Sequence, residues 1–225
     1  MPRKARVFST TSELLAEVAS KRAKLEGWFD ARIPSLRQIV DSAVGSNTYR
    51  GITGFDPGPK HVFTGWASRQ LNNPNFQQHI VAILGQADFD VWLESFADDL
   101  RQYWPSTQRT RKKIEYGQSR KLTNLLMKAF VLWDELDDRP RLQLISYLHS
   151  PLDEYVLKGI KECSAEFSHY PVTIPDNPTM SSVRNSVMYN NIQFILREIA
   201  AKAGLAPIHL DIFFWNLNHL DADER

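Results

Sequence analysis

Residues 116–130, which read YGQSRKLTNLLMKAF, decide the fold. Apolar side chains recur there at helical spacing and predict a helix with one buried face, at Leu122, Leu125, Leu126 and Ala129. Gly117 precedes this face, so we expect a glycine turn there and a helix over about 118–135. Lys121 then lies near the start of the helix, and Lys128 lies one heptad later.

The rest of the chain repeats this helical pattern, without a convincing run of strict alternation that would indicate strands. The spacing predicts helices over 12–28, 35–44, 75–85, 89–103, 141–148, 153–164, 178–203 and 208–217. The segment 45–66 is rich in turn formers and predicts a long ordered loop or a short hairpin. We therefore expect a mainly α fold: residues 1–225 form one compact helical domain, or two helical lobes around a cleft.

Composition limits the function classes. Of the 225 residues, 43% are hydrophobic, and no apolar run approaches the roughly 20 residues needed to cross a bilayer. We expect a cytoplasmic monomer without membrane contact. The single cysteine, Cys163, excludes an internal disulfide and a thiolate metal cage, and its helical setting favours a packing role. We find no local metal or nucleotide motif, and expect no metal and no cofactor.

Basic residues gather in residues 109–121, although the net charge of the whole chain is only +1. Because Gly117 divides this cluster, we expect much of its charge at a turn, where free backbone N–H groups could dock phosphates of DNA. A solvated surface would give the same pattern. The candidate DNA-binding residues are Arg109, Arg111, Lys112, Lys113, Tyr116, Gly117, Gln118, Ser119 and Arg120.

Two polar residues are candidates for catalysis. Lys121 borders an apolar wall, and loss of solvation favours the neutral, nucleophilic form of an amine, although a lysine there could equally extend into solvent. Asp153 follows Lys121 by 32 positions (153 − 121) and stands directly before a predicted helix. Its simplest role is that of a helix N-cap, but a carboxylate fixed in this way could also stabilise a developing positive charge.

The pair resembles the helix-hairpin-helix DNA glycosylases, and most closely the divergent branch that includes the archaeal GO glycosylase. The resemblance covers about 109–160. It rests on Lys121 with Lys128 and on Pro151-Leu152-Asp153, with weaker support from 207–215. The usual Leu-Pro-Gly-Val-Gly hairpin is replaced here by residues 114–118, and no cysteine cluster follows. A weaker likeness is to phage-defence glycosylases that act on glucosylated hydroxymethylcytosine.

This resemblance implies a DNA glycosylase that flips out a damaged or modified base, in DNA repair or in phage defence. Lys121 would be the nucleophile and Asp153 the carboxylate, with or without strand cleavage by an AP-lyase step. The candidate walls of the base pocket are Trp66, Tyr155, Phe214 and Trp215. These aromatic residues could instead fill the core. Two alternatives stay open: a non-catalytic helical nucleic-acid-binding module, and a helical interaction protein.

Overall fold

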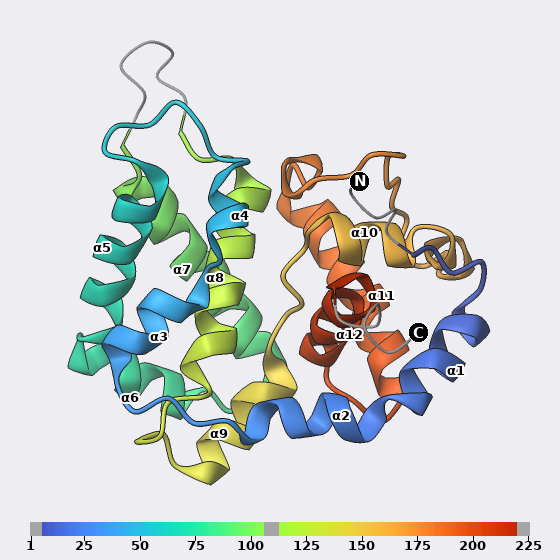
Figure 1. Ribbon diagram of the computed structural model, residues 1–225, viewed down its shortest axis with the longest axis horizontal. Coiled ribbons are helices and arrows are strands. Elements are labelled where there is room, and N and C mark those ends of the chain that lie inside the picture. Colours follow the sequence, from blue (N-terminus) through green and yellow to red (C-terminus); the bar gives the residue numbers. More distant parts are fainter. Residues whose placement is uncertain (1–5, 106–112, 220–225) are drawn as a thin grey trace. The chain divides into compact units, whose positions relative to one another are not determined.

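The computed structural model describes residues 6–105 and 113–219 (Figure 1). This part of the chain is mainly α-helical, and its one β-type pairing is an isolated bridge between Ile33 and Trp133. The chain divides into two compact units. Unit 1 combines Met1–Asp30 with Leu148–Arg225, and unit 2 is Ala31–Tyr147.

Unit 1 is built around α12, which packs against α2, α10 and α11. Its elements are α1 (Thr11–Ser20), α2 (Arg22–Glu26), the 3₁₀ turn η1 (Gly27–Asp30), α10 (Glu154–Ile160), η2 (Cys163–Glu166), η3 (Met180–Ser182), α11 (Ser186–Lys202) and α12 (Pro207–His219). The rings of Phe8, Phe213 and Phe214 pack together in its core. Cys163 is fully buried, which confirms its packing role, and burial raises the pKa of its thiol to about 11.

Unit 2 is built around α8, which packs against α3 and α7. Its elements are α3 (Leu36–Ala43), α4 (Ser46–Tyr49), α5 (Pro59–Leu71), α6 (Pro74–Ala82), α7 (Gln86–Tyr103), α8 (Tyr116–Phe130) and α9 (Asp138–Tyr147). An aromatic cluster of Phe76, Trp92, Phe96 and Phe130 fills the space between α6, α7 and α8. These large rings supply much of the apolar area that the unit removes from water.

Several helices begin at a side chain that accepts a backbone N–H bond. Thr10 caps α1, Ser35 caps α3, Asn73 caps α6 and Asn185 caps α11. The helix expected over 12–28 is interrupted at Lys21, whose backbone leaves the helical region, and it resumes as α2.

The loop expected over 45–66 is much shorter than the sequence predicts. Residues 46–49 form α4, and α5 begins at Pro59, because proline is well suited to the first helical position. Only the glycine- and proline-rich residues 50–58 remain irregular between these two helices. Phe63 and Trp66 lie on the buried face of α5. No helix within the described ranges is both long and apolar enough to cross a membrane.

Candidate functional site

Lys121 lies in the second turn of α8 in unit 2, five positions after the first helical residue, Tyr116. It is partly buried, and the neighbouring residues Arg120 and Leu122 are buried. Leu122, Leu126 and Ala129 are buried as predicted, while Leu125 is only partly buried. Thus Lys121 borders the packed face of the helix.

The glycine turn predicted at Gly117 is wrong. Glu115 is the N-cap of α8, and Gly117 lies inside the helix and is buried. Glu115 and Gln118 form a capping box, in which the Glu115 N–H donates to Oε1 of Gln118 at 3.0 Å. These reciprocal bonds use donors that a phosphate would need, so the first turn of α8 does not offer the open anion site that the sequence suggests.

The remaining candidate DNA-binding residues divide into three groups. Gln118, Ser119 and Arg120 are at most 4% exposed, and Tyr116 is partly buried. Lys113 is exposed just before α8. Arg109, Arg111 and Lys112 lie outside the described residues.

The buried polar side chains of α8 have structural partners. Gln118 donates to the carbonyl of Gly51 at 3.0 Å, and Ser119 donates to the carbonyl of Tyr116 at 2.8 Å. The Arg120 guanidinium lies 3.0 Å from a carboxylate oxygen of Glu94 in α7. Glu94 has no local motif around it, and the sequence analysis did not identify it.

Asp153 is the N-cap of α10 in unit 1, as predicted. Its Oδ1 accepts hydrogen bonds from the backbone N–H groups of Tyr155 at 2.9 Å and of Val156 at 3.1 Å. The carboxylate is partly buried and lies at the positive end of the helix dipole, where a negative charge is stabilised. Burial, followed by the charges of Glu154 and Asp153, raises the pKa of Tyr155.

A buried hydrogen-bond network holds the chain just before Asp153. The backbone of Ser150 exchanges two bonds with the side chain of Gln193, at 3.1 and 2.8 Å, and its hydroxyl donates to the carbonyl of Pro207 at 2.5 Å. This clamp fixes the start of the Pro151-Leu152-Asp153 segment, and Gln193, far away in the sequence, was not predicted.

His149 is placed in the same network. Nη2 of Arg197 lies 2.6 Å from its Nε2, and the hydroxyl of Tyr189 lies 2.8 Å from its Nδ1. Since a guanidinium only donates, Nε2 must accept, and the ring proton of a neutral imidazole is then on Nδ1. His149 is therefore held by α11, from which both Tyr189 and Arg197 project.

The four candidate aromatic residues divide into buried and accessible ones. Trp66 is fully buried in unit 2, where its Nε1 donates to Asp99 at 2.6 Å, and Phe214 is 1% exposed in unit 1. Both rings fill the core, so the expectation that they line a base pocket is not supported by their burial. Trp215 is 46% exposed.

Trp215 and Tyr155 both contact His219 at the end of α12. Trp215 stacks on the imidazole with centroids 4.4 Å apart, and Tyr155 meets it edge-on at 5.0 Å. Because Tyr155 follows Asp153 by two positions, unit 1 combines a fixed carboxylate and an accessible aromatic cluster. His219 is a member of this cluster that the sequence analysis missed.

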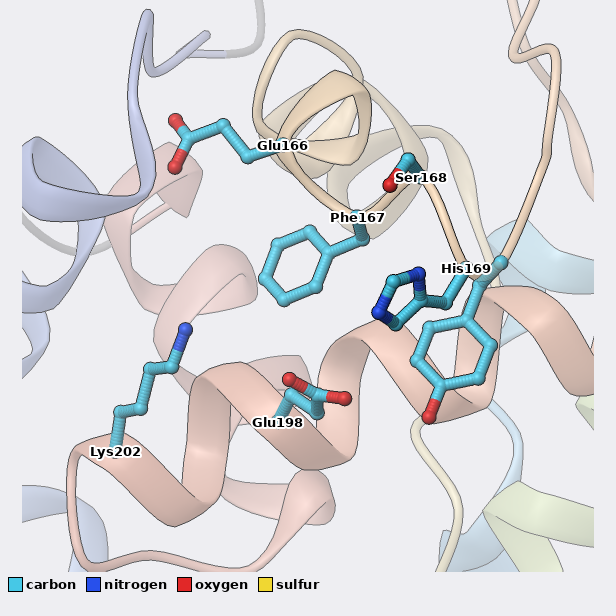
Figure 2. A pocket seen from close by; sticks show the side chains of 7 residues that line it. Glu166, Phe167, Ser168, His169, Glu198 and Lys202 are labelled. Atoms are coloured by element: carbon cyan, nitrogen blue, oxygen red, sulfur yellow. The ribbon is translucent and has the colours of Figure 1, made fainter.

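Unit 1 also contains a pocket of about 210 Å³ lined by Glu166, Phe167, Ser168, His169, Tyr170, Glu198 and Lys202 (Figure 2). Glu198 and Lys202 project from α11 toward the ring of Phe167, and the Lys202 ammonium lies 5.2 Å from the ring centroid. Oε1 of Glu166 accepts the backbone N–H of Thr11 at 2.8 Å. None of the predicted site residues lines this pocket. In the described ranges, no group of three or more His, Cys, Asp or Glu side chains is placed to hold a metal ion.

Neither protein-family models, nor curated proteins, nor solved structures match this chain. Its function is therefore inferred from its own residues. They supply a partly buried amine on α8 of unit 2, a fixed carboxylate at α10 of unit 1, and exposed aromatic surface beside that carboxylate.

Proposed function

We propose that this protein is a DNA glycosylase that excises a damaged or modified base, with Lys121 as nucleophile and Asp153 as the assisting carboxylate. The observation that supports this best is the setting of Asp153. Two backbone N–H groups fix its carboxylate, and the residue two positions later, Tyr155, belongs to an aromatic cluster with the half-exposed Trp215. The likeness of Lys121 and Asp153 to the catalytic pair of helix-hairpin-helix glycosylases supports the same assignment.

Base flipping is the first step of the proposed reaction. The target nucleotide must leave the stack, at a cost of a few kcal/mol, before its anomeric carbon can be reached. Stacking on an aromatic face offsets part of this cost. Trp215 is the best candidate for this face because its ring is accessible, whereas Trp66 and Phe214 are committed to the core.

Bond exchange at the sugar follows. The neutral amine of Lys121 attacks the anomeric carbon, the glycosidic bond breaks, and its electron pair leaves with the base, which takes up a proton. The Asp153 carboxylate stabilises the positive charge on the sugar and accepts a proton from the attacking nitrogen. Opening of the sugar ring gives a Schiff base, from which the strand can be cleaved or water can release the product.

Trapping with borohydride tests the nucleophile. Hydride reduces a Schiff base to a stable secondary amine, so substrate DNA should become covalently attached to the wild-type protein. We expect Lys121→Gln to abolish this product. Lys158→Gln is the control, because Lys158 is another lysine of the chain, paired with Glu154 on α10 at 2.6 Å. Trapping should stay at the wild-type level in this variant.

The carboxylate is tested by Asp153→Asn. Asparagine is as good an N-cap as aspartate, so this change removes the charge while the helix start is preserved. We expect single-turnover base release to fall at least about a hundredfold, as for loss of an acid–base group. Glu154→Gln removes the neighbouring charge. The rate should stay within about twofold of wild type, because Glu154 takes no part in the proposed proton transfer.

These measurements need DNA that contains the right base. A panel of duplexes and single strands should include 8-oxoguanine, uracil, alkylated purines and glucosylated cytosines. If Lys121→Gln and Asp153→Asn both retain full base release, the assignment fails. If no member of the panel yields an abasic product and binding weakens steeply with salt, a non-catalytic nucleic-acid-binding module is the better description.

A further inference from the structure

The start of α5, in unit 2, opens into a pocket that the proposed reaction does not use. Its volume is about 460 Å³, and it is lined by Tyr49, Gly58, Pro59, Lys60, His61 and Thr64. The first turn of every α-helix has backbone N–H groups without partners inside the helix. In α5 these groups lie beside the pocket, because Gly58 is the N-cap and Pro59 is the first helical residue.

The first turn of α5 lacks the side-chain cap that α1, α3, α6, α10 and α11 have. Gly58 has no side chain, and proline has no N–H to donate. The backbone N–H groups of Lys60 and His61 have no acceptor among the described residues. Asp56 is nearby in the sequence, but it does not line the pocket and its carboxylate does not cap the helix.

Tyr49 provides a second, independent indication of a ligand. The residue is only 9% exposed, and it lines the same pocket. Its ring packs on Phe63, with centroids 6.2 Å apart, but its hydroxyl has no hydrogen-bond partner in the part of the chain that the structure describes. The hydroxyl oxygen is not among the fully buried polar atoms without a partner, so it keeps access to solvent and can donate to a bound group. Burial raises the pKa of Tyr49, so the phenol keeps its proton and remains a donor.

The polar groups of the pocket suit an anion. Two backbone N–H groups, the phenol and the ammonium of Lys60 are donors, the helix dipole adds partial positive charge, and no carboxylate is among the lining residues. We propose that the start of α5 binds a phosphate group of a DNA strand. This deepens the proposed function, on which the choice of DNA as the source of phosphate rests. It also provides the phosphate contact that the capped first turn of α8 does not.

An adjoining pocket favours a polymer over a free phosphate ion. It has a volume of about 330 Å³, shares His61 and Thr64 with the first pocket, and continues along α3 and α5 to Gly65 and Ser68. Arg37, whose side chain is 92% exposed, also lines it, together with Asp41, whose carboxylate lies 3.9 Å from the guanidinium. A strand whose phosphate lies at α5 therefore has a basic side chain along its path.

The decisive variant is Gly58→Asp. A Cβ at Gly58 meets nothing within 4 Å, and an aspartate there can cap the helix and occupy the anion site with its own carboxylate. Gly85→Asp is the matched control: Gly85 is the N-cap of α7, also lacks a side-chain cap, and also has open space around its Cβ. Both variants change the net charge equally, and both should fold with unchanged or higher melting temperature.

Binding is measured by fluorescence anisotropy with an undamaged 20-base-pair duplex over a series of salt concentrations. We expect Gly58→Asp to weaken binding about tenfold and to reduce the slope of log K against log salt by about 0.9, the value for one phosphate. Gly85→Asp should stay within about twofold of wild type, because a single exposed charge away from the contact is largely screened. Tyr49→Phe should keep the fold and weaken binding about threefold, as for loss of one hydrogen bond.

Equal binding by the two aspartate variants would overturn this inference, and so would a wild-type protein that does not retain DNA. A titration with inorganic phosphate distinguishes the source. If millimolar phosphate shifts the amide signals of Lys60 and His61 in NMR spectra while the duplex leaves them unchanged, the site takes a small phosphate and the DNA assignment is wrong. Loss of binding in Gly58→Asp without base release from any substrate would retire the glycosylase proposal and leave the phosphate site standing.

Discussion

Nη1 of Arg120 lies 3.0 Å from Oε2 of Glu94, and the arginine side chain is only 2% exposed. The hydroxyl of Tyr116 donates to the same carboxylate oxygen at 2.9 Å. Two residues that the sequence assigns to DNA thus converge on one acid of α7 and fasten α8 to its neighbour. Arg120 and Tyr116 belong to the framework that positions Lys121, one residue farther along the same helix.

Loss of the Glu94 carboxylate should therefore destabilise unit 2. Removing one partner of a buried ion pair costs about 3–5 kcal/mol, and we expect about 2 kcal/mol for Glu94→Gln because the Glu94 side chain is 35% exposed and screened by water. The free energy of unfolding is measured by urea denaturation. Asp41→Asn disrupts the open pair with Arg37 and should change it by less than about 0.5 kcal/mol. If both variants lose similarly little free energy of unfolding, the ion pair between Arg120 and Glu94 contributes little to stability.

Substitution at Asp153 should separate stability from chemistry. We expect Asp153→Ala to lower the free energy of unfolding by about 1 kcal/mol, because it removes the cap from α10, while Asp153→Asn stays within a few tenths. Thr10→Ala, which removes the equivalent cap of α1, sets the scale of the effect. A loss of stability in Asp153→Asn as large as that in Asp153→Ala would show that the charge itself stabilises the fold, and base release by this variant would then need correction for unfolded protein.

Most of the helices could be predicted because their signals are local. Apolar periodicity marks α7, α8 and α11, and Asp153 before an apolar run was identified as an N-cap. Gly117 was misinterpreted because a glycine among polar residues has the same local signature in a turn and in a helix start. The capping box and the packing of α8 against α3 and α7 favour the helix.

The surroundings of the candidate site could not be predicted from local patterns. Gln193 contacts Ser150 from 43 positions later in the sequence, and Tyr189 contacts His149 from 40 positions later. No spacing rule links residues so far apart. Trp66 looked like an accessible aromatic residue in a loop only because the start of α5 at Pro59 was not recognised. Lys121 and Asp153 were identified by their residue types and spacing, and each belongs to a different unit.

Gly159 should not tolerate a side chain. A Cβ at this position would lie 2.2 Å from Cε1 of Phe214, whose ring is 1% exposed and packed on Phe8 and Phe213. Overpacking destabilises a folded protein by about 1–3 kcal/mol, and the better helix propensity of alanine offsets at most about 1 kcal/mol of this loss. We therefore expect Gly159→Ala to lower the melting temperature. Gly27→Ala, where the nearest atom to the added Cβ is a carboxylate oxygen of Asp30 at 3.5 Å, is the control and should change it little. An unchanged melting temperature in Gly159→Ala would mean that the Phe214 ring can move at no cost.

His209 should make the stability of unit 1 depend on pH. Burial lowers the pKa of this imidazole, which outweighs the opposing effects of the Ala206 backbone and Glu26. The backbone N–H of Ala206 donates to its Nδ1 at 3.2 Å, and the ring of Phe29 meets it edge-on at 5.2 Å. A proton on Nδ1 would replace the bond from the Ala206 N–H by one to the Ala206 carbonyl, 3.1 Å away, but it would also place a charge in an apolar setting, so the folded protein favours the neutral ring.

The sign of the effect follows from proton binding. Below the unfolded pKa of about 6.5, the unfolded chain binds a proton at this position more readily than the folded chain, so stability rises with pH. The contribution is complete above about pH 7.5 and is lost as the pH falls toward the folded pKa, with a slope of at most about 1.4 kcal/mol per pH unit for one proton. His209→Gln is the test, because glutamine at the third helical position can accept the same N–H bond without titrating. We expect the unfolding free energy of wild type minus that of the variant to decrease between pH 7.5 and pH 5; a difference that stays constant over this range would exclude His209 as the source.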